Sequence, residues 1–262
     1  TEGAPAVFTV SLSNASTTAV SFTPTLANGS ATLGTDTATT SALEVSTDNG
    51  NNWNPVAGAV TIAAGQTSVQ LRLATTDDAV VESTETFTLS TGALTGTLTS
   101  NASVTGTASI TDNDVAPTFA INDVTVNEGA GTATFTITRS GSSAAAASAD
   151  YATSNGTATA GNDYTAIATT TVNFAAGETT KTVTVTIAND SVFEGSETFN
   201  VDLSNASGAT IADSQGVGTI KDDGSGSGGT TDNDTPTLSI SSPTVTEGAP
   251  AVFTVSLSNA ST

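Results

Sequence analysis

Acidic residues gather in short clusters along this chain, and basic residues that could balance them are scarce. The sequence holds 25 Asp and Glu residues against 4 Lys and Arg residues, for a net charge of −21. Asp77, Asp78, Glu82 and Glu85 fall within nine positions. Carboxylates at this density repel one another unless a cation lies between them. Many oxygen ligands without nitrogen or sulfur donors are the ligand set that Ca²⁺ prefers, so calcium binding is the first chemistry to consider.

The acidic clusters recur in the same order along the chain and lie at expected strand ends or turns. They contain 18 of the 25 acidic residues. The alternative interpretation is that they are solvated turn residues, because Asp is an ordinary turn former. The candidate metal ligands are Glu2, Asp36, Asp77, Asp78, Glu82, Glu85, Asp112, Asp114, Glu128, Asp163, Asp190, Glu194, Glu197, Asp222, Asp223, Asp232, Asp234 and Glu247.

The composition argues against several other functions. The chain has no Cys, His or Met, which excludes disulfides, thiolate metal sites and Ser–His or Cys–His catalysis. A pair such as Glu82 and Glu85 could serve a glycosidase, but one Trp and two Tyr suggest no aromatic cleft, so we expect no enzyme. The negative charge disfavours nucleic acid, and the lack of a run of about 18 apolar residues disfavours membrane insertion.

A long internal repeat sets the organisation of the chain. Residues 1–17 and residues 246–262 share the sequence TEGAPAVFTVSLSNAST, at an offset of 245 residues. A match of this length is not a chance event. The chain therefore contains one repeat unit and the start of the next, as in a tandem array.

A weaker repeat divides this unit into two homologous modules. ESTETFTLS from Glu82 is similar to EGSETFNVDLS from Glu194, and three further pairs of similar segments occur in the same order in both halves. We predict a first module over residues 1–116 that lacks its first strand, a second over 117–235 with a flexible Gly/Ser-rich linker at 224–231, and the first strands of the next repeat of module 1 over 236–262.

Apolar residues alternate with polar ones over short stretches, which is typical of strands with one buried face. Val69, Leu71 and Leu73 alternate with polar residues, and so do Val183 and Val185. Stretches of this kind, separated by Gly, Asn and Asp, predict an all-β fold made of tandem immunoglobulin-like antiparallel β-sandwiches.

These motifs together resemble the Calx-β domain family. The shared features are an EG pair near the first strand, the turn Gly161-Asn162-Asp163-Tyr164, a DD-x-x-x-E-x-x-E-x-F run from Asp77, and a closing acidic tripeptide. The resemblance implies a seven-stranded sandwich with several Ca²⁺ ions at one end of each module. Two positions depart from the pattern: Asn189 replaces the first Asp of the pair, and Thr37 replaces the Tyr of the turn.

The function expected from these observations is structural. We expect a calcium-binding segment of an extracellular adhesin, stalk or matrix fibre, secreted or on the cell surface, stiffened by Ca²⁺ at module ends. Adjacent copies of the repeat would be its partners, and residues 236–262 should pack against a first-type module. The alternatives are an adhesion module for a glycan or protein receptor, with the loop before Trp53 as a candidate contact, and a filament subunit that assembles head to tail by strand donation.

Overall fold

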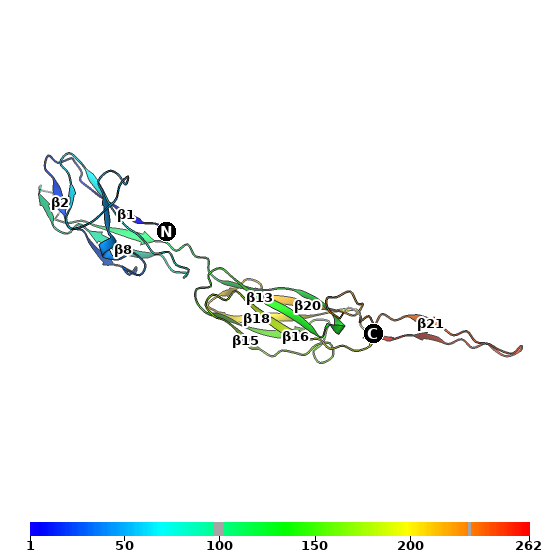
Figure 1. The fold of residues 1–262 in the computed structure, drawn as a ribbon. Helices are drawn as coiled ribbons and strands as arrows, with labels where there is room; N and C mark the ends of the chain where they lie inside the picture. The colour runs from blue at the N-terminus through cyan, green and yellow to red at the C-terminus, as the bar shows by residue number, and fades with distance from the viewer. Residues whose placement is uncertain (97–101, 230–231) are drawn as a thin grey trace. The chain divides into compact units, whose positions relative to one another are not determined.

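The chain folds into two compact units, residues 1–115 and 116–262. The computed structural model describes residues 1–96, 102–229 and 232–262 (Figure 1). Its regular structure is almost entirely β-strand, so the predicted all-β sandwich fold is confirmed. The described residues contain two short 3₁₀ helices, η1 (Thr40–Ala42) and η2 (Glu128–Ala130). No helix in these ranges is long and apolar enough to cross a membrane.

The strands of the first unit form three sheets, in the orders β1-β7-β4-β5, β10-β8-β3 and β6-β2-β9. Neighbouring strands within these sheets are antiparallel. The strands are β1 (Ala6–Ser11), β2 (Val20–Phe22), β3 (Thr25–Asn28), β4 (Glu44–Ser46), β5 (Asn54–Pro55), β6 (Val60–Ile62), β7 (Ser68–Leu73), β8 (Glu85–Ser90), β9 (Leu94–Gly96) and β10 (Thr105–Ile110).

The core of the first unit follows the predicted alternation. Val69, Leu71 and Leu73 on β7 are buried. Phe8 on β1 meets Phe87 on β8 edge to face, with the ring centroids 5.7 Å apart. This contact joins two sheets, because β1 and β8 belong to different ones. The core between the sheets therefore contains the side chains that the alternation of apolar and polar residues had placed on the buried face.

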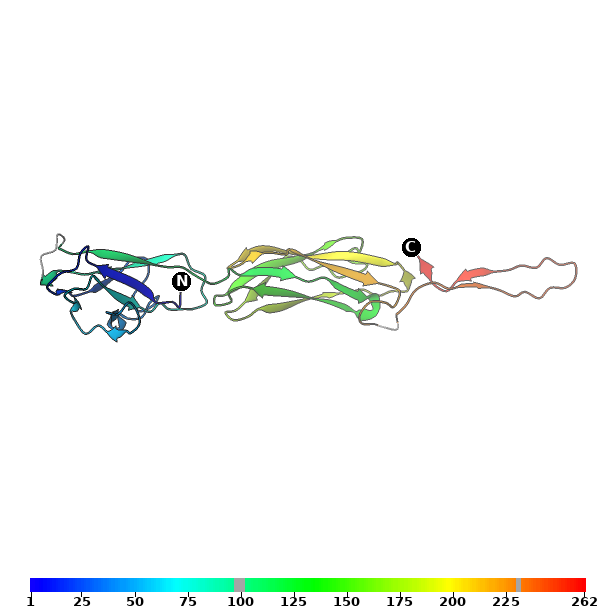
Figure 2. The ribbon, with the colours of Figure 1, turned by 90° about the horizontal axis from the view of Figure 1, so that it is seen from above.

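The second unit contains two larger sheets, in the orders β16-β13-β11-β19 and β12-β20-β18-β14-β15. Figure 2 shows their strands running lengthwise through the unit. The strands are β11 (Thr118–Ile121), β12 (Val124–Asn127), β13 (Thr132–Ser140), β14 (Ala147–Asn155), β15 (Thr170–Phe174), β16 (Thr180–Thr186), β17 (Val192–Phe193), β18 (Ser196–Ser207), β19 (Thr210–Ile211) and β20 (Gln215–Lys221).

The first extended segment of the second unit crosses from one sheet to the other, and its two halves are the strands β11 and β12. β11 pairs antiparallel with β13, whereas β12 pairs parallel with β20 in the opposite sheet. At the crossing, Asn122 Oδ1 accepts a hydrogen bond from the Thr136 amide and Asp123 Oδ1 accepts one from the Val217 amide. The parallel edge pairs depart from the purely antiparallel pairing that the sequence predicted. This crossing brings the end of β12, and Glu128 after it, next to the end of β20.

Residues 236–262 take a different place from the one predicted. β21 (Leu238–Ile240) pairs with β22 (Val255–Leu257), and β23 (Ala260–Ser261) pairs with β17 of the second module. Among the described residues the segment thus pairs with itself and with β17 rather than with strands of a first-type module. Leu238 and Ile240 consequently stay 72% and 64% exposed.

Trp53 is neither fully exposed nor fully buried. Its indole Nε1 donates to the Gly50 carbonyl over 3.0 Å, and the Arg72 guanidinium lies 4.4 Å from the ring centroid. Arg72 in turn pairs with Glu44 at 2.6 Å. The side chain is therefore held at the surface by a cation–π contact.

Candidate metal centres

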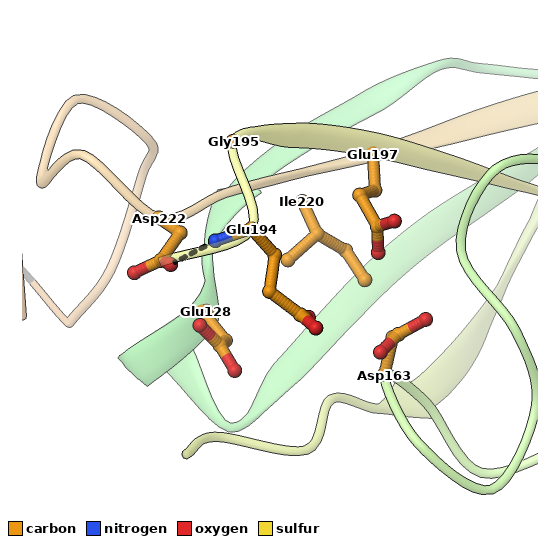
Figure 3. Close-up of a pocket in the computed structure, with 7 residues that line it drawn as sticks. All are labelled: Glu128, Asp163, Glu194, Gly195, Glu197, Ile220 and Asp222. Atoms are coloured by element: carbon orange, nitrogen blue, oxygen red, sulfur yellow. Dashed lines mark hydrogen bonds between the residues drawn. The ribbon is translucent and has the colours of Figure 1, made fainter. Parts of the chain in front are cut away.

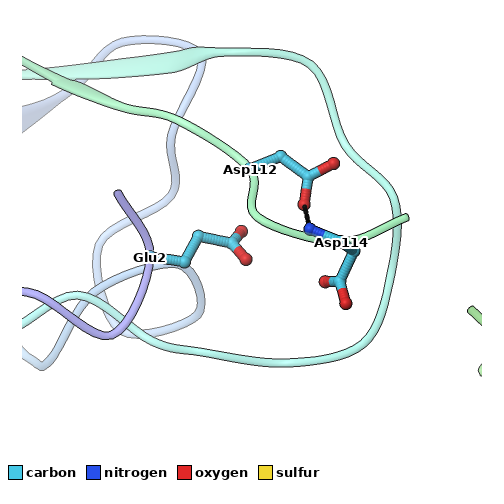
Figure 4. A group of neighbouring side chains, drawn as sticks. All are labelled: Glu2, Asp112 and Asp114. Atoms are coloured by element: carbon cyan, nitrogen blue, oxygen red, sulfur yellow. Dashed lines mark hydrogen bonds between the residues drawn. The ribbon is translucent and has the colours of Figure 1, made fainter. Parts of the chain in front are cut away.

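Three acidic side chains meet where the chain enters and leaves the first unit. Glu2 precedes β1, and its amide donates to the Thr111 carbonyl at the end of β10. Asp112 and Asp114 follow directly, and the Asp114 amide donates to Asp112 Oδ1 over 2.9 Å. Ligand oxygens of Glu2, Asp112 and Asp114 lie within 4.8 Å of one another (Figure 4). Together they make a three-carboxylate group at one end of the module.

A second group in the same unit consists of Asp36, Glu82 and Glu85, again with ligand oxygens within 4.8 Å. The turn before Asp36 is fixed because its Oδ2 accepts from the Thr32 amide over 2.6 Å. The Glu82 amide donates to Asp112 Oδ2 over 3.0 Å. This bond joins the two groups, since Asp112 belongs to the first one. The first unit therefore carries adjoining acidic groups rather than scattered acids.

The second unit repeats the Asp36 arrangement. Asp163, Glu194 and Glu197 bring ligand oxygens within 4.8 Å of one another, and Figure 3 shows their carboxylates around a small pocket. Glu128, Asp222, Gly195 and Ile220 complete the lining of this pocket. The Asp163 turn is fixed by a 2.6 Å bond from the Thr159 amide, the counterpart of the Thr32 bond. Similar local sequences thus build the same kind of group in both units.

The remaining group of the second unit contains Glu128, Asp232 and Asp234. Asp222 lies beside it: its Oδ2 accepts from the Glu194 amide over 3.0 Å, and its carbonyl accepts from the Asp234 amide over 3.3 Å. The sequence had placed Asp232 and Asp234 ahead of the third copy. The structure instead brings both to Glu128 of the second module.

Other predicted ligands lie outside these four groups. Asp78 and Asp190 each accept from an amide two residues ahead over 2.7 Å, and Asp77 accepts from Asn113 Nδ2 over 3.1 Å. Asp190 remains adjacent to its group, because its amide donates to Glu128 Oε1 over 3.0 Å. Glu247 is exposed in the C-terminal segment and belongs to none of the groups found among the described residues.

Asp223, another predicted ligand, also lies outside the four groups. Its Oδ1 accepts from both the amide and the hydroxyl of Ser225. These hydrogen bonds, helped by the Lys221 charge, hold the pKa of Asp223 below its usual range. The carboxylate is therefore satisfied within its own turn, and it is not part of the group around Glu128.

One residue in this region was not expected to contribute. Asn127 is fully buried, and its side chain donates to the Asp232 carbonyl over 3.2 Å while accepting from the Gly129 amide over 3.0 Å. It thereby holds Asp232 beside Glu128. Its position directly before the EG pair was the only available signal in the sequence.

Six carboxylate oxygens in these regions are buried and have no hydrogen-bond donor among the described residues. Buried polar groups are nearly always paired, so such a concentration of unpaired acceptors calls for a missing partner. Since each of these six oxygens is an acceptor surrounded by other carboxylates, a cation fits these sites and an anion does not. The unpaired oxygens are Glu2 Oε2, Asp114 Oδ2, Glu128 Oε2, Asp222 Oδ1, Asp232 Oδ2 and Asp234 Oδ2.

Two carboxyl groups of the second unit have clearly raised pKa values. Burial, together with the charges of Asp222, Asp190 and Asp232, raises the pKa of Glu128 to about 7, against the lowering effect of the Asp190 amide. Burial and the neighbouring Asp163 raise the pKa of Glu197 to about 7. Without a cation, the folded protein therefore resists full ionisation of these sites.

Two properties define the class of protein: tandem β-sandwiches, and acidic loop groups at module ends without basic partners. The family model of the Calx-beta domain matches residues 16–116 and again residues 110–223. The chain therefore belongs to the Calx-beta domain family, and it contains two such domains in tandem. The second match ends at residue 223, before Asp232 and Asp234.

Comparison with solved structures also gives matches. The apo form of the Calx CBD1 domain is 25% identical, with 41% of this chain and 97% of that chain covered and a TM-score of 0.39. CBD12 from CALX1.2 is 18% identical, with 83% and 93% covered and a TM-score of 0.40. No curated protein sequence matches this chain.

Proposed function

We propose that this chain binds Ca²⁺ at the acidic groups of both modules. The observation that carries the proposal is the set of buried, donor-free carboxylate oxygens at the Glu2 and Glu128 groups. Six to eight oxygen ligands in flexible geometry suit Ca²⁺, whereas Mg²⁺ demands a smaller octahedral site that keeps several waters. Zinc sites favour nitrogen and sulfur ligands, and the chain has neither Cys nor His. Calcium is therefore the cation that fits best.

Bound at these groups, Ca²⁺ would supply positive charge that the sequence lacks and would hold three chain segments together. In the first module, Glu2 belongs to the entering segment, Glu82 to the β7–β8 loop and Asp112 to the end of β10. Glu128, Glu194 and Asp222 have the corresponding positions in the second module. Because the unpaired oxygens belong to separate loops, binding stabilises the closed arrangement of each module end.

The finer proposal is a non-enzymatic, stiffened segment of an extracellular repeat protein, such as an adhesin, stalk or matrix fibre. The 17-residue identity between residues 1–17 and 246–262 supports a tandem array. In such an array, calcium at module ends would limit bending between neighbours. The acidic surface would keep a long array soluble.

Titration calorimetry tests the calcium proposal. Glu82→Gln and Glu194→Gln should each weaken Ca²⁺ binding on the order of tenfold or more, because substitution of a residue that orients a metal ligand already has an effect of this size. Glu44→Gln and Asp202→Gln are the controls: Glu44 pairs with Arg72, and Asp202 accepts from Ser154 and Gln215, away from every group. A chelator should also lower the melting temperature. Free Ca²⁺ at about 100 times the Kd of one site would add roughly 2.7 kcal/mol to the free energy of unfolding, and the chelator removes this contribution. No heat of binding and an unchanged melting curve would reject the proposal.

A second candidate role is association between copies through residues 236–246. By sequence alignment with the second module, Leu238, Ile240 and Val245 correspond to Phe119, Ile121 and Val126, which are all buried there. Here the same positions are 72%, 64% and 47% exposed. In the first unit, β10 is the edge of its sheet, whereas its counterpart β20 is covered by β12. A row of unpaired backbone groups at such an edge can accept an added strand.

This role predicts concentration-dependent association of the 262-residue chain. Because donor and acceptor lie in different parts of the molecule, the contact is heterologous and builds an open chain of copies. Sedimentation analysis should show a mass that grows with concentration, and Ile240→Asp should keep the protein monomeric. Val7→Asp, on an already exposed face of β1, is the control. A monomeric wild-type protein at every concentration would reject association by this route.

A further inference from the structure

The two modules close their Glu2-type sites with different parts of the chain. Asp114 follows Asp112 by two positions, but Asp234 follows Asp222 by twelve, so the second module has an insertion of ten residues. Despite this, Asp234 joins Glu128 just as Asp114 joins Glu2. The insertion therefore leaves the site and returns to it. Residues 223–229 and 232 of this insertion are described.

The insertion is held against the second module by backbone contacts. The Asn127 amide donates to the Ser227 carbonyl over 3.0 Å, and Ser227 Oγ donates to the Thr125 carbonyl over 2.6 Å. A Cβ on Gly226 would lie 2.3 Å from the Asn127 nitrogen, so only glycine permits this approach. The stretch 224–229 thus packs along β12, although its composition suggested a flexible linker; residues 230 and 231 of that predicted linker lie outside the described residues.

The returning end of the insertion places a carboxylate over Gly129. A Cβ on Gly129 would lie 2.7 Å from Asp232 Cβ. In the first module the glycine after Glu2 is covered in the same way: a Cβ on Gly3 would lie 3.1 Å from Asp77 Cβ. The two modules therefore cover equivalent glycines with an Asp, but from different positions in the sequence.

The position equivalent to Asp77 in the second module is Asn189, which carries no charge. Asp232 Oδ2 and Glu128 Oε2 are both buried without a donor, and Glu128 is only 6% exposed. Their oxygens lie within 4.8 Å of each other. The pair thus provides an unpaired acceptor set on the side where the module has lost a carboxylate.

We propose that Asp232 replaces the missing carboxylate of position 189 as a Ca²⁺ ligand, so that cation binding by the second module depends on its inserted loop. This inference rests on the proposed calcium function. It makes Asp232, at the returning end of the insertion, a ligand of the site. It also predicts that a carboxylate at position 189 can substitute for Asp232.

Amide exchange measured across a calcium titration tests this directly, because it reports each module separately. The full chain is followed in peptides covering residues 76–85 and 186–196 and in the loop at 223–229. Asp232→Asn should raise the calcium concentration for half-protection of 186–196 and of the loop on the order of tenfold or more. The 76–85 peptide should be unaffected and serves as an internal control.

Two further variants complete the test. Asp223→Asn lies in the same loop but its carboxylate bonds to Ser225, so it should behave as wild type. Asn189→Asp combined with Asp232→Asn should recover most of the lost affinity. Wild-type protection in Asp232→Asn, or failure of the double variant to recover, would overturn the substitution. No calcium-dependent protection in either module of the wild-type protein would instead reject the calcium function itself.

Discussion

At the scale of single residues, the four acidic groups share one property: none of their members forms an ion pair with a Lys or Arg among the described residues. The described residues contain two ion pairs, Arg72–Glu44 and Lys181–Glu178, and neither Glu44 nor Glu178 belongs to one of the four candidate metal centres. Glu128 and Glu197 are instead surrounded by other carboxylates. The folded chain therefore carries electrostatic strain that protons or cations can relieve.

The calcium-free protein should become more stable as the solution is acidified from about pH 8 to about pH 5. The pKa of Glu128 rises from 4.5 to about 7 on folding, and that of Glu197 does the same. A carboxyl whose pKa is raised in the folded state binds its proton more tightly there. Its contribution to stability is therefore complete below the unfolded pKa and is lost as pH rises through about 7.

Melting temperatures measured in chelator across this pH range check the prediction. Glu128→Gln and Glu197→Gln should flatten the profile, because the side chain no longer titrates. With saturating Ca²⁺ the trend should weaken or reverse, since protons then compete with the cation for the same oxygens. A calcium-free protein that loses stability steadily on acidification would contradict the assigned pKa shifts.

At the scale of elements, close packing decides which strand positions tolerate a side chain. Gly218 on β20 faces the core, and a Cβ there would lie 2.4 Å from Cζ of the Phe199 ring. Phe199 in turn stacks on Tyr164, with the centroids 4.6 Å apart. The ring is confined on both sides and cannot move away without disturbing the acidic turn that contains Asp163.

Gly218→Ala should therefore destabilise the second module by about 1–3 kcal/mol, the usual effect of overpacking a core. The neighbouring Thr219 is on the opposite face of the same strand, so Thr219→Ala provides a matched control with a smaller effect. Urea unfolding of both variants, followed by far-ultraviolet circular dichroism, gives the comparison. Equal stability of Gly218→Ala and wild type would show that the ring has room to shift.

At the scale of the whole molecule, net charge and repetition act together. A net charge of −21 opposes compaction and close contact between copies, so a cation that neutralises module ends has an effect beyond its own site. The repeat places such an acidic end in each module. Under the function proposed above, calcium would then act at regular intervals along the array.

The sequence by itself determined the fold class, the two-module organisation and the kind of chemistry. Alternation at Val69, Leu71 and Leu73 identified a buried strand face, because side-chain direction in a strand depends only on local geometry. The absence of Cys and His limited the metal ligands to oxygen. Glu82 and Glu194 occupy the same position in the two repeated segments, and this identified equivalent loops, because the order of the strands fixes the loop to which a residue belongs.

Only the tertiary structure decided which acids meet. The sequence placed Asp223 in the second site as part of its closing acidic segment and placed Asp232 ahead of the third copy, but the folded chain turns Asp223 toward Ser225 and brings Asp232 to Glu128. The reason is the ten-residue insertion, whose path depends on contacts such as Asn127 with Ser227. Local patterns predict where a loop begins, whereas the place to which it returns is set by packing between segments distant in sequence.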